Sequence, residues 1–560
     1  MMKLLKNESP GWKYKVSRIK SIFSPNITLH DDKSGMKIEK NVLIPMRDGV
    51  SLCANIFRPL GDKPTPVIMS AHPYGKDSFC IKGAWRNRFR FSYRISHQIK
   101  PITLSTWTSW EAPDPVFWVK KGYTVINLDT RGFHQSPGVA SVLSDQEAQD
   151  YYDAIEWAAE QSWSNGSVGL CGVSYLAISQ WKVAALTPPS LKAICPWEGF
   201  TDAYRDFFYH GGIREQGFSA IWLRTVAKSG KLKIDYSMEV KHRKLRDLFY
   251  KKMIPPLEKI TVPALIGATF SDQDMHTPGS FRAFCNINSP QKWVYTHRGP
   301  KWATFYSSEA LACQLKFFNH FLKQENNGWE KTPPVRLEVR DTHNEITVVR
   351  WIENWPPKDI AWQKLYLQFS TGQLNIEPPL LKDQADIALH LPAGRIDFYY
   401  TIERDTQIIG PMLLAMGAYF DKICDARLFV KVWKYRDGVN VPFEGTLGYG
   451  YDSVSQGFLR VNLNDKDFTI ETCYQSEPAY DRQLVIQPKQ IIPLKIKLLE
   501  SATLFKKNDV LKLSISGKKL TKKNPLTGQF PFRYQPSAKG KIYFSHPSEP
   551  AYLLIPMRHE

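Results

Sequence analysis

The chain has 560 residues, of which 43% are hydrophobic and 13% aromatic, and this composition indicates a globular protein of two to four domains. No run of 18 apolar residues occurs and residues 1–23 lack the apolar core of a secretory signal, which excludes a helical membrane span and predicts a soluble, cytoplasmic protein. The formal net charge of +20 comes with no nucleic-acid-binding motif, so no nucleic acid partner is expected.

Positive charge is concentrated in two segments. Met1–Ser24 carries six Lys or Arg against one Glu, and Gly517–Lys541 carries seven against no acidic residue. Such segments are most often solvated faces that aid solubility, and adsorption to an anionic membrane is the other interpretation.

The eight cysteines are scattered, without a CxxC pair or a Cys/His cluster at the spacing of zinc ligands. This pattern predicts buried thiols in a reducing compartment, and neither disulfides nor a metal site. The cysteines are Cys53, Cys80, Cys171, Cys195, Cys285, Cys313, Cys424 and Cys473.

In the first 330 residues, short apolar runs alternate with helical patterns. The helix is clearest at Glu147–Glu160, where Tyr151, Ala154, Ile155 and Ala158 have the spacing of an amphipathic crossover helix. The alternation predicts an α/β fold with a doubly wound sheet of buried parallel strands. The expected strands are Val67–Ala71, Tyr123–Leu128, Val168–Cys171, Leu191–Cys195, Val262–Ala268 and Trp293–Thr296.

An aromatic-rich segment with helical bias interrupts this alternation between Pro196 and about Leu257. An insertion at the carboxyl edge of such a sheet lies over the ligand crevice, so we expect a cap that supplies the substrate pocket. A helical decoration on the flank of the domain is the alternative.

The pattern changes after Pro333 and Pro334, where short strands follow one another without a convincing helix. This spacing predicts an all-β sandwich or jelly roll of about 220 residues. The expected strands are Val335–Val339, Lys364–Phe369, Ile396–Ile402, Ala426–Trp433, Phe458–Asn464, Leu484–Gln487, Leu494–Leu499, Val510–Ser516 and Lys541–Ser545.

Ser174 is the candidate nucleophile. The segment Ser167–Trp181 reads as a short strand, a turn at Gly172 and the start of a helix, which is the outline of a nucleophile elbow. Position 176 is Leu, so the strict G-x-S-x-G pattern is not met, and an ordinary buried turn between strand and helix is the alternative.

A candidate acid and base follow Ser174 in the chain. Asp272 and Asp274 come just after one expected strand, and His297 ends the next. Because α/β hydrolases carry their triad in the order Ser, Asp or Glu, His, we expect Asp272 and His297 to serve Ser174. Asp274 is the alternative acid, although Asp272 lies nearer to the strand end.

The oxyanion of acyl transfer needs hydrogen-bond donors. One should be the backbone N–H of Tyr175, the residue after the nucleophile. The second should come from the loop after an early strand, His72–Asp77, where Tyr74 is as well suited to packing as to donating its hydroxyl.

These motifs together resemble the CocE/NonD hydrolases, a family that includes cocaine esterase, glutaryl acylases, α-amino acid ester hydrolases and X-Pro dipeptidyl-peptidases. The resemblance covers nearly all of the chain after residue 37. It rests on 46–59 (MRDGVSLCANIFRP), 72–77 (HPYGKD), 122–138 (GYTVINLDTRGFHQSPG), 172–181 (GVSYLAISQW), 271–281 (SDQDMHTPGSF), 295–302 (YTHRGPKW) and 333–341 (PPVRLEVRD).

The resemblance implies the triad Ser174, Asp272 and His297, with Tyr74 as oxyanion-hole tyrosine. The family elbow, G-x-S-Y-x-G, accounts for Leu at 176, but its last Gly is here Ala177, which puts the fit of the helix in question. The implied organisation is a basic extension (1–36), an α/β-hydrolase domain (37–195 and 259–332), a helical cap (196–258) and a jelly roll (333–560).

The DTRG segment of the resemblance is expected to be structural. We expect Asp129 and Arg131 to fix the loop beside the elbow by bidentate pairing, next to Gly132.

The expected activity is hydrolysis of an ester or amide through an acyl-enzyme, without metal or cofactor. Candidate pocket residues are Trp197, Glu198, Asp202 and Phe208.

An X-Pro dipeptidyl-peptidase, which must neutralise a substrate ammonium, is the alternative, and a non-catalytic carbohydrate- or ligand-binding protein using the jelly roll is another. The sequence is compatible with a homodimer. Carboxylates that could face an ammonium are Glu198, Asp202, Asp206 and Glu215, and the arginines that could face a carboxylate are Arg205, Arg214 and Arg224.

Overall fold

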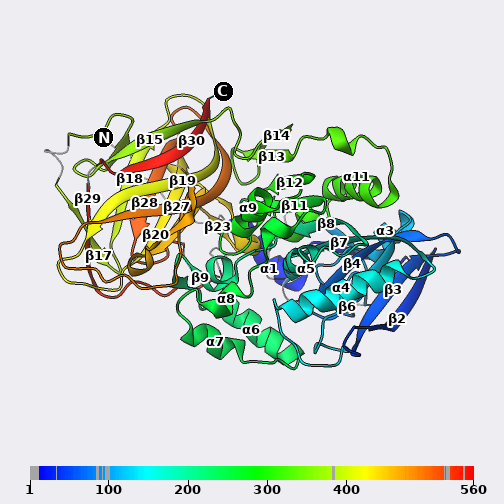
Figure 1. Ribbon diagram of the computed structural model, residues 1–560. Coiled ribbons are helices and arrows are strands. Elements are labelled where there is room, and N and C mark those ends of the chain that lie inside the picture. The colour runs from blue at the N-terminus through cyan, green and yellow to red at the C-terminus, as the bar shows by residue number, and fades with distance from the viewer. Residues whose placement is uncertain are drawn as a thin grey trace.

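The computed structural model describes residues 12–559 except 33–34, 84–87, 91–92, 95–100, 381–384, 473–474, 522–523, 525–529 and 547–548. At Lys13, 466–472 and 475–476 only the backbone is described. An α/β part with the central sheet lies beside a β-rich part formed by the second half of the chain (Figure 1). The helices α6 (Phe218–Ser229), α7 (Tyr236–His242) and α8 (Leu248–Lys251) lie at the lower middle of this view.

The central sheet has the strand order β2-β3-β6-β4-β7-β8-β11-β12-β13, with neighbours parallel from β6 to β13. All six expected strands are present, so the predicted α/β sheet is confirmed. The antiparallel edge strands β2 and β3 were not predicted. The bounds are β2 Met36–Pro45, β3 Ser51–Pro59, β4 Thr65–His72, β6 Thr124–Asp129, β7 Ser164–Val173, β8 Leu191–Trp197, β11 Ala264–Thr269 and β12 Lys292–His297.

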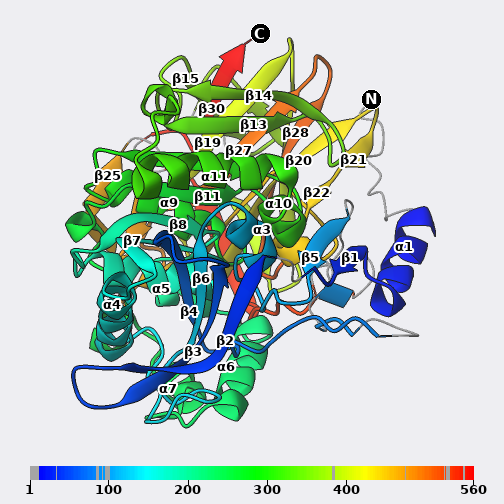
Figure 2. The ribbon, with the colours of Figure 1, turned by 90° about the vertical axis from the view of Figure 1, so that its right-hand side faces the viewer.

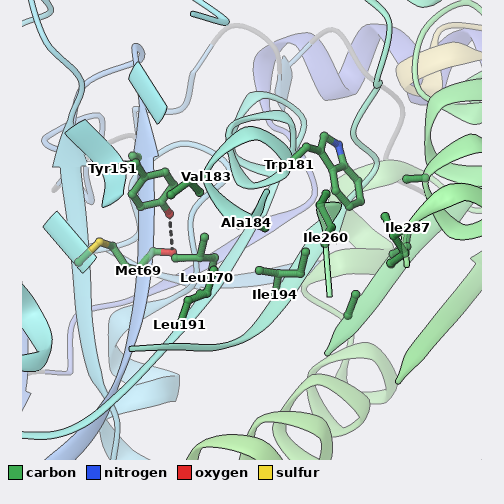
Figure 3. Close-up of a cluster of buried hydrophobic side chains, with 14 of the residues drawn as sticks. Met69, Tyr151, Leu170, Trp181, Val183, Ala184, Leu191, Ile194, Ile260 and Ile287 are labelled. Atoms are coloured by element: carbon green, nitrogen blue, oxygen red, sulfur yellow. Dashed lines mark hydrogen bonds between the residues drawn. The ribbon is translucent and has the colours of Figure 1, made fainter. Parts of the chain in front are cut away.

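Helices cover both faces of this sheet. The predicted crossover helix is α4, Asp145–Ala159, and its four predicted apolar residues are buried. Figure 3 shows one of them, Tyr151, donating its hydroxyl hydrogen to the carbonyl oxygen of Met69 at 3.1 Å. The same core holds Trp181 of α5, whose ring lies near Ile260 and Ile287. The other helices of this part are α3 Pro115–Lys120, α5 Tyr175–Ala184, α9 Thr277–Asn286, α10 Lys301–Phe305 and α11 Ser308–Lys323.

The predicted cap segment is mainly helical, as expected, and also contains a short antiparallel hairpin, β9 to β10. Its elements are a π-helix at Tyr204–Phe208, β9 Tyr209–His210, β10 Ile213–Arg214, α6 Phe218–Ser229, α7 Tyr236–His242, α8 Leu248–Lys251 and a 3-10 turn at Leu257–Lys259.

The C-terminal part is all-β, apart from single helical turns, as predicted. The strand expected at Leu484–Gln487 is wrong, because this segment has no ladder pairing, and Phe458–Asn464 ends in a 3-10 turn. The strands are β13 Val335–Arg340, β14 Ile346–Ile352, β15 Ala361–Gln368, β16 Gln373–Asn375, β17 Ile387–Leu391, β18 Arg395–Thr401, β19 Thr406–Tyr419, β20 Arg427–Arg436, β21 Val439–Val441, β22 Phe443–Glu444, β23 Tyr451–Asp452, β24 Ser455–Arg460, β25 Lys466–Thr472, β26 Gln475–Pro478, β27 Ile492–Phe505, β28 Val510–Ser516, β29 Gly540–Ser545 and β30 Tyr552–His559.

The two parts share backbone hydrogen bonding. Strand β13 pairs in parallel with β12, with Val335 opposite Val294, and then pairs with β27 of the β-rich part. The central sheet therefore continues across the predicted boundary at residue 333.

The described residues before the central sheet include helix α1, Trp12–Phe23, and strand β1, Ile27–His30, which pairs in parallel with β5, Ile102–Ser105. Among the described residues, no helix combines the length and hydropathy that a membrane crossing requires. The seven described cysteines are unpaired, and Cys473 lies outside the described residues.

Candidate active site

Ser174 stands on a strained turn between β7 and α5. Its backbone has φ 60° and ψ −116°, a combination that side-chain-bearing residues rarely adopt, and the residue is only half-buried. Gly172 has φ +157°, and a Cβ atom there would stand 2.4 Å from the Cβ atom of Leu176. The turn therefore requires glycine at 172 and exposes the Ser174 hydroxyl, as a nucleophile elbow does.

Ala177, which replaces the last glycine of the elbow pattern, is accommodated by its neighbour. It faces Gly199, where an added Cβ atom would stand 3.0 Å from the Ala177 Cβ atom. Because Gly199 has no side chain, the extra methyl group of Ala177 fits between α5 and the segment that follows β8.

His276 is the imidazole beside the serine. Its Nε2 atom lies 3.1 Å from the Ser174 Oγ atom, and its ring stacks on Phe200 with centroids 5.9 Å apart. The residue is fully buried at the start of α9, and its backbone N–H donates to the carbonyl oxygen of Asp272 at 3.0 Å. Its Nδ1 atom has no hydrogen-bond partner among the described residues.

His297, the base expected from the sequence, does not contact Ser174. Its Nε2 atom lies 3.2 Å from Glu198 Oε1, its ring stacks on Trp197, and neither ring nitrogen makes a hydrogen bond within the described part of the chain. His297 was expected because it ends the strand after the acid, whereas the histidine that contacts Ser174 follows the acid within the same loop. The sequence evidence for His276 was its place in the motif SDQDMH at 271–276, directly after the candidate acids.

A buried cluster of charged side chains surrounds Lys301. Lys301 Nζ is 3.1 Å from Asp272 Oδ2 and 3.8 Å from Glu198 Oε2. Neither carboxylate oxygen of Asp272 hydrogen-bonds to an imidazole of the described chain, so the expected Asp272–His297 pair is not formed. Glu111 belongs to the same electrostatic cluster and accepts a hydrogen bond from Trp302 Nε1 at 3.0 Å.

The cluster shifts the pKa values of its members. Burial raises the pKa of Asp272 and of Glu111 to about 7 in each case, against the opposing charge of Lys301. Burial disfavours the charged form of Lys301, but the neighbouring carboxylates outweigh this effect and raise its pKa. Burial, reinforced by the charge of Lys301, lowers the pKa of His276 well below 6.5. His276 is therefore neutral near pH 7 and able to accept a proton.

Asp274, the alternative acid, faces the C-terminal part of the chain. Its carboxylate accepts hydrogen bonds from Tyr534 at 2.8 Å, Gln456 at 3.2 Å and Thr446 at 3.1 Å, and it forms an ion pair with Lys519. The positive charges of Lys519 and Lys431 lower its pKa to about 2, although burial alone would raise it. Asp274 thus ties the loop that carries the histidine to the β-rich part.

Tyr74 lies in the pocket, in the loop after β4. Its hydroxyl oxygen accepts a hydrogen bond from Trp222 Nε1 at 3.0 Å, which leaves its own hydrogen available to a ligand. The loop is fixed by Asp129, whose Oδ1 atom accepts from the backbone N–H of Lys76 at 2.6 Å. The Tyr175 N–H stands at the first position of α5, where the helix offers it no acceptor.

The expected pairing of Asp129 with Arg131 is wrong. Arg131 instead makes a bidentate contact with Asp150 of α4, at 2.7 and 2.6 Å, and an ion pair with Asp48. Asp129 and Arg131 are thus held by different segments, and both contacts are structural.

Ser174, Tyr74 and His276 open into one pocket of about 160 Å³. Its walls come from the elbow, the Tyr74 loop, the cap and the loop that contains Leu447 and Tyr449. Most of its side chains are aromatic or aliphatic, and the described Arg, Lys, His, Asp and Glu side chains that line it are Arg90, Glu111 and His276. The apolar wall consists of Trp110, Ile178, Phe200, Phe207, Phe218, Ile221, Trp222, Met275, Trp302, Leu447 and the ring of Tyr449.

The four pocket residues expected from the sequence, Trp197, Glu198, Asp202 and Phe208, are buried elsewhere and do not line this pocket. Asp202 caps the π-helix and pairs with Arg246. The cap contributes to the pocket wall, as predicted, but through residues other than the four expected ones. The expected cap residues pack inside the cap and hold it together.

The remaining cap carboxylates are also engaged. Asp206 pairs with Arg282 at 2.8 Å. Glu215 accepts hydrogen bonds from the backbone N–H groups at the start of α6, including that of Ser219 at 2.7 Å. Neither lines the pocket, so no carboxylate of the cap that the sequence suggested faces a substrate there.

Comparison with known proteins agrees with this architecture. Residues 48–247 match the family model of the X-Pro dipeptidyl-peptidases (S15 family), and residues 327–540 match that of the X-Pro dipeptidyl-peptidase C-terminal non-catalytic domain. A solved CocE/NonD family hydrolase from Staphylococcus aureus is 34% identical with a TM-score of 0.86, and the match covers 93% of this chain and 94% of that one.

Two further relatives are more distant or shorter matches. Cocaine esterase of Rhodococcus sp. (strain MB1 Bresler) is 36% identical over 176 residues, which are 31% of this chain and only 26% of that enzyme. An α-amino acid ester hydrolase has a TM-score of 0.67 at 18% identity, over 95% of this chain and 98% of that one, and shares the fold.

Proposed function

Because this chain belongs to the CocE/NonD family of hydrolases, we propose that it hydrolyses esters of uncharged, apolar acyl groups through an acyl-enzyme on Ser174. The observation that carries the proposal is the contact of 3.1 Å between Ser174 Oγ and His276 Nε2 in a pocket with apolar walls.

In the proposed reaction, His276 Nε2 takes the hydroxyl proton while Ser174 Oγ attacks the substrate carbonyl carbon. The Tyr74 hydroxyl and the Tyr175 N–H donate to the oxyanion. The protonated His276 then gives its proton to the leaving alkoxide as the C–O bond breaks. A water molecule then attacks the acyl carbon while His276 takes its proton. The bond between the acyl carbon and Oγ breaks, and His276 returns the proton to Ser174 Oγ as the acid leaves.

Asp272 has an indirect part in this proposal. Its carboxyl group pairs with Lys301 instead of an imidazole, and the charge of Lys301 favours neutral His276. The stacking of the His276 ring on Phe200 supports its orientation toward Ser174. We therefore propose Ser174 and His276 as the reacting pair in place of the predicted set Ser174, Asp272 and His297.

The test is turnover of a short substrate panel by the wild type and Ser174→Ala. The panel contains p-nitrophenyl acetate and butyrate, phenyl benzoate, glutaryl p-nitroanilide, and Gly-Pro and Ala-Pro p-nitroanilides. We expect serine-dependent cleavage of the butyrate and benzoate esters, with a loss of at least about 10⁴-fold in Ser174→Ala. Unchanged ester cleavage by a folded Ser174→Ala would refute the nucleophile. Lack of labelling of the wild type by a fluorophosphonate would favour a binding protein.

The X-Pro dipeptidyl-peptidase activity is the second candidate, and the observation in its favour is Glu111, a carboxylate that lines the pocket. Its raised pKa and its bond to Trp302 make it a weak partner for an ammonium group. Cleavage of the prolyl anilides that Glu111→Gln abolishes would establish this candidate.

Tyr74→Phe is expected to lower kcat/KM for p-nitrophenyl butyrate by about 100-fold, because one oxyanion donor is lost. Tyr123→Phe is the matched control, since its hydroxyl binds Asn319 outside the pocket and its loss should leave kcat/KM within about threefold. Steady-state kinetics of the two variants checks this, and equal kcat/KM for Tyr74→Phe and wild type would remove Tyr74 from the oxyanion hole.

The acid limb of the pH profile of kcat/KM is expected to have its midpoint below pH 6.5. The base must be neutral, and burial together with Lys301 lowers the pKa of His276. Below about pH 7 Asp272 and Glu111 become protonated, so fewer negative charges offset the positive charge of Lys301. The pKa of His276 is then lowered further, and its imidazole stays neutral at lower pH. Initial rates between pH 4.5 and 8.5 measure the midpoint, and a value at or above 6.5 contradicts this reading.

A further inference from the structure

Helix α1 presents an apolar stripe to solvent. The side chains of Trp12, Val16 and Ile19 are 76%, 41% and 41% exposed. At about 100° per residue these three positions fall within an arc of about 60° on the helix surface. Phe23, 62% exposed, lies on the same line, so the stripe runs along the whole helix.

The opposite face of α1 is attached to the body of the protein. Arg18 is 3% exposed and donates a hydrogen bond from Nη1 to the carbonyl oxygen of Gly448 at 3.0 Å. The ring centroid of Tyr14 lies 4.6 Å from that of Tyr451. These contacts fix the rotation of the helix, so that the stripe faces outward at the edge of the molecule, where Figure 2 shows α1.

The charges around the stripe indicate what could cover it. Lys15 and Lys20 border it on either side, at about −60° and +80° from Trp12 on the helical wheel. The helix contains no acidic residue, and the chain carries a net charge of +20. A second copy of the chain would bring the same basic face against itself, whereas a surface of anionic headgroups attracts it.

We propose that α1 is an interfacial helix that binds the enzyme to the surface of an anionic bilayer. Its 12 residues span about 18 Å, less than the roughly 30 Å of hydrocarbon in a bilayer, so the helix lies along the surface. Trp12, Val16 and Ile19 enter the headgroup region, while Lys15 and Lys20 contact lipid phosphates. Binding through one short helix is reversible and depends on lipid charge and on salt.

The test is co-sedimentation with vesicles of phosphatidylcholine alone and with 30% phosphatidylglycerol, in low and in physiological salt. The full chain with Ser174→Ala is used beside the wild type, so that binding is measured independently of turnover. We expect both to bind the anionic vesicles and neither to bind phosphatidylcholine. Trp12→Ala/Ile19→Ala should weaken binding at least about tenfold, and Lys15→Glu/Lys20→Glu at least about fivefold.

Matched controls separate α1 from general effects. Leu248→Ala/Val485→Ala removes two other exposed apolar side chains, and Lys358→Glu/Lys422→Glu makes the same charge change elsewhere. We expect these controls to bind as the wild type does, and all four variants to retain its hydrolysis of p-nitrophenyl butyrate. No binding by the wild type, or equal losses in the controls, overturns the proposal. A concentration-dependent dimer that Trp12→Ala/Ile19→Ala abolishes would identify a second copy as the occupant and overturn it too.

Discussion

His276→Ala is expected to lower kcat/KM for p-nitrophenyl butyrate by about 10⁴-fold, because no other imidazole of the described chain contacts the Ser174 hydroxyl. His297→Asn is the matched variant. Its imidazole lies against Glu198 away from the pocket, so we expect a change of less than about tenfold in kcat/KM, with lower stability.

The two variants discriminate between the two assignments of the base. Single-turnover acylation and circular dichroism spectra are measured for both, so that a loss of activity is not mistaken for a loss of fold. If His297→Asn is the inactive one and His276→Ala keeps more than a tenth of the wild-type kcat/KM, the triad predicted from the sequence is right and our proposal is wrong.

Lys301→Met is expected to lower the free energy of unfolding by about 3–5 kcal/mol at pH 8. The substitution leaves Asp272 and Glu198 buried without the ammonium group that lies 3.1 and 3.8 Å from them. The loss should be smaller at pH 5, because Asp272, with its pKa raised to about 7, is then protonated and carries no charge to compensate.

Urea unfolding at pH 5 and pH 8 measures this difference. Asp272→Asn/Lys301→Met removes one carboxylate together with the ammonium group, and we expect it to recover part of the loss at pH 8. Lys358→Met, an exposed lysine, should stay within about 0.5 kcal/mol of the wild type. A Lys301→Met variant that unfolds like the wild type at pH 8 would mean that the cluster is hydrated or already neutral.

Sequence patterns predicted a strand or helix well where the residues of that segment alone determine its structure. The six parallel strands and α4 follow from apolar runs and from helical spacing. Strand β19 was missed because it is buried on both faces and contains Gly410 and Pro411, so its residues neither alternate nor avoid turn formers. The run at Leu484–Gln487 has the composition of a strand, but no neighbouring strand pairs with it.

The sequence by itself determined the α/β sheet, the all-β C-terminal part and the position of Ser174, because each depends on residues that are neighbours in the chain. Only the tertiary structure decided which histidine meets the serine. His276 and His297 both follow strand β11, and their order along the chain does not reveal that Lys301 occupies the place beside Asp272. The partners of a buried carboxylate are set by packing between distant segments, and that packing brings His276 to Ser174.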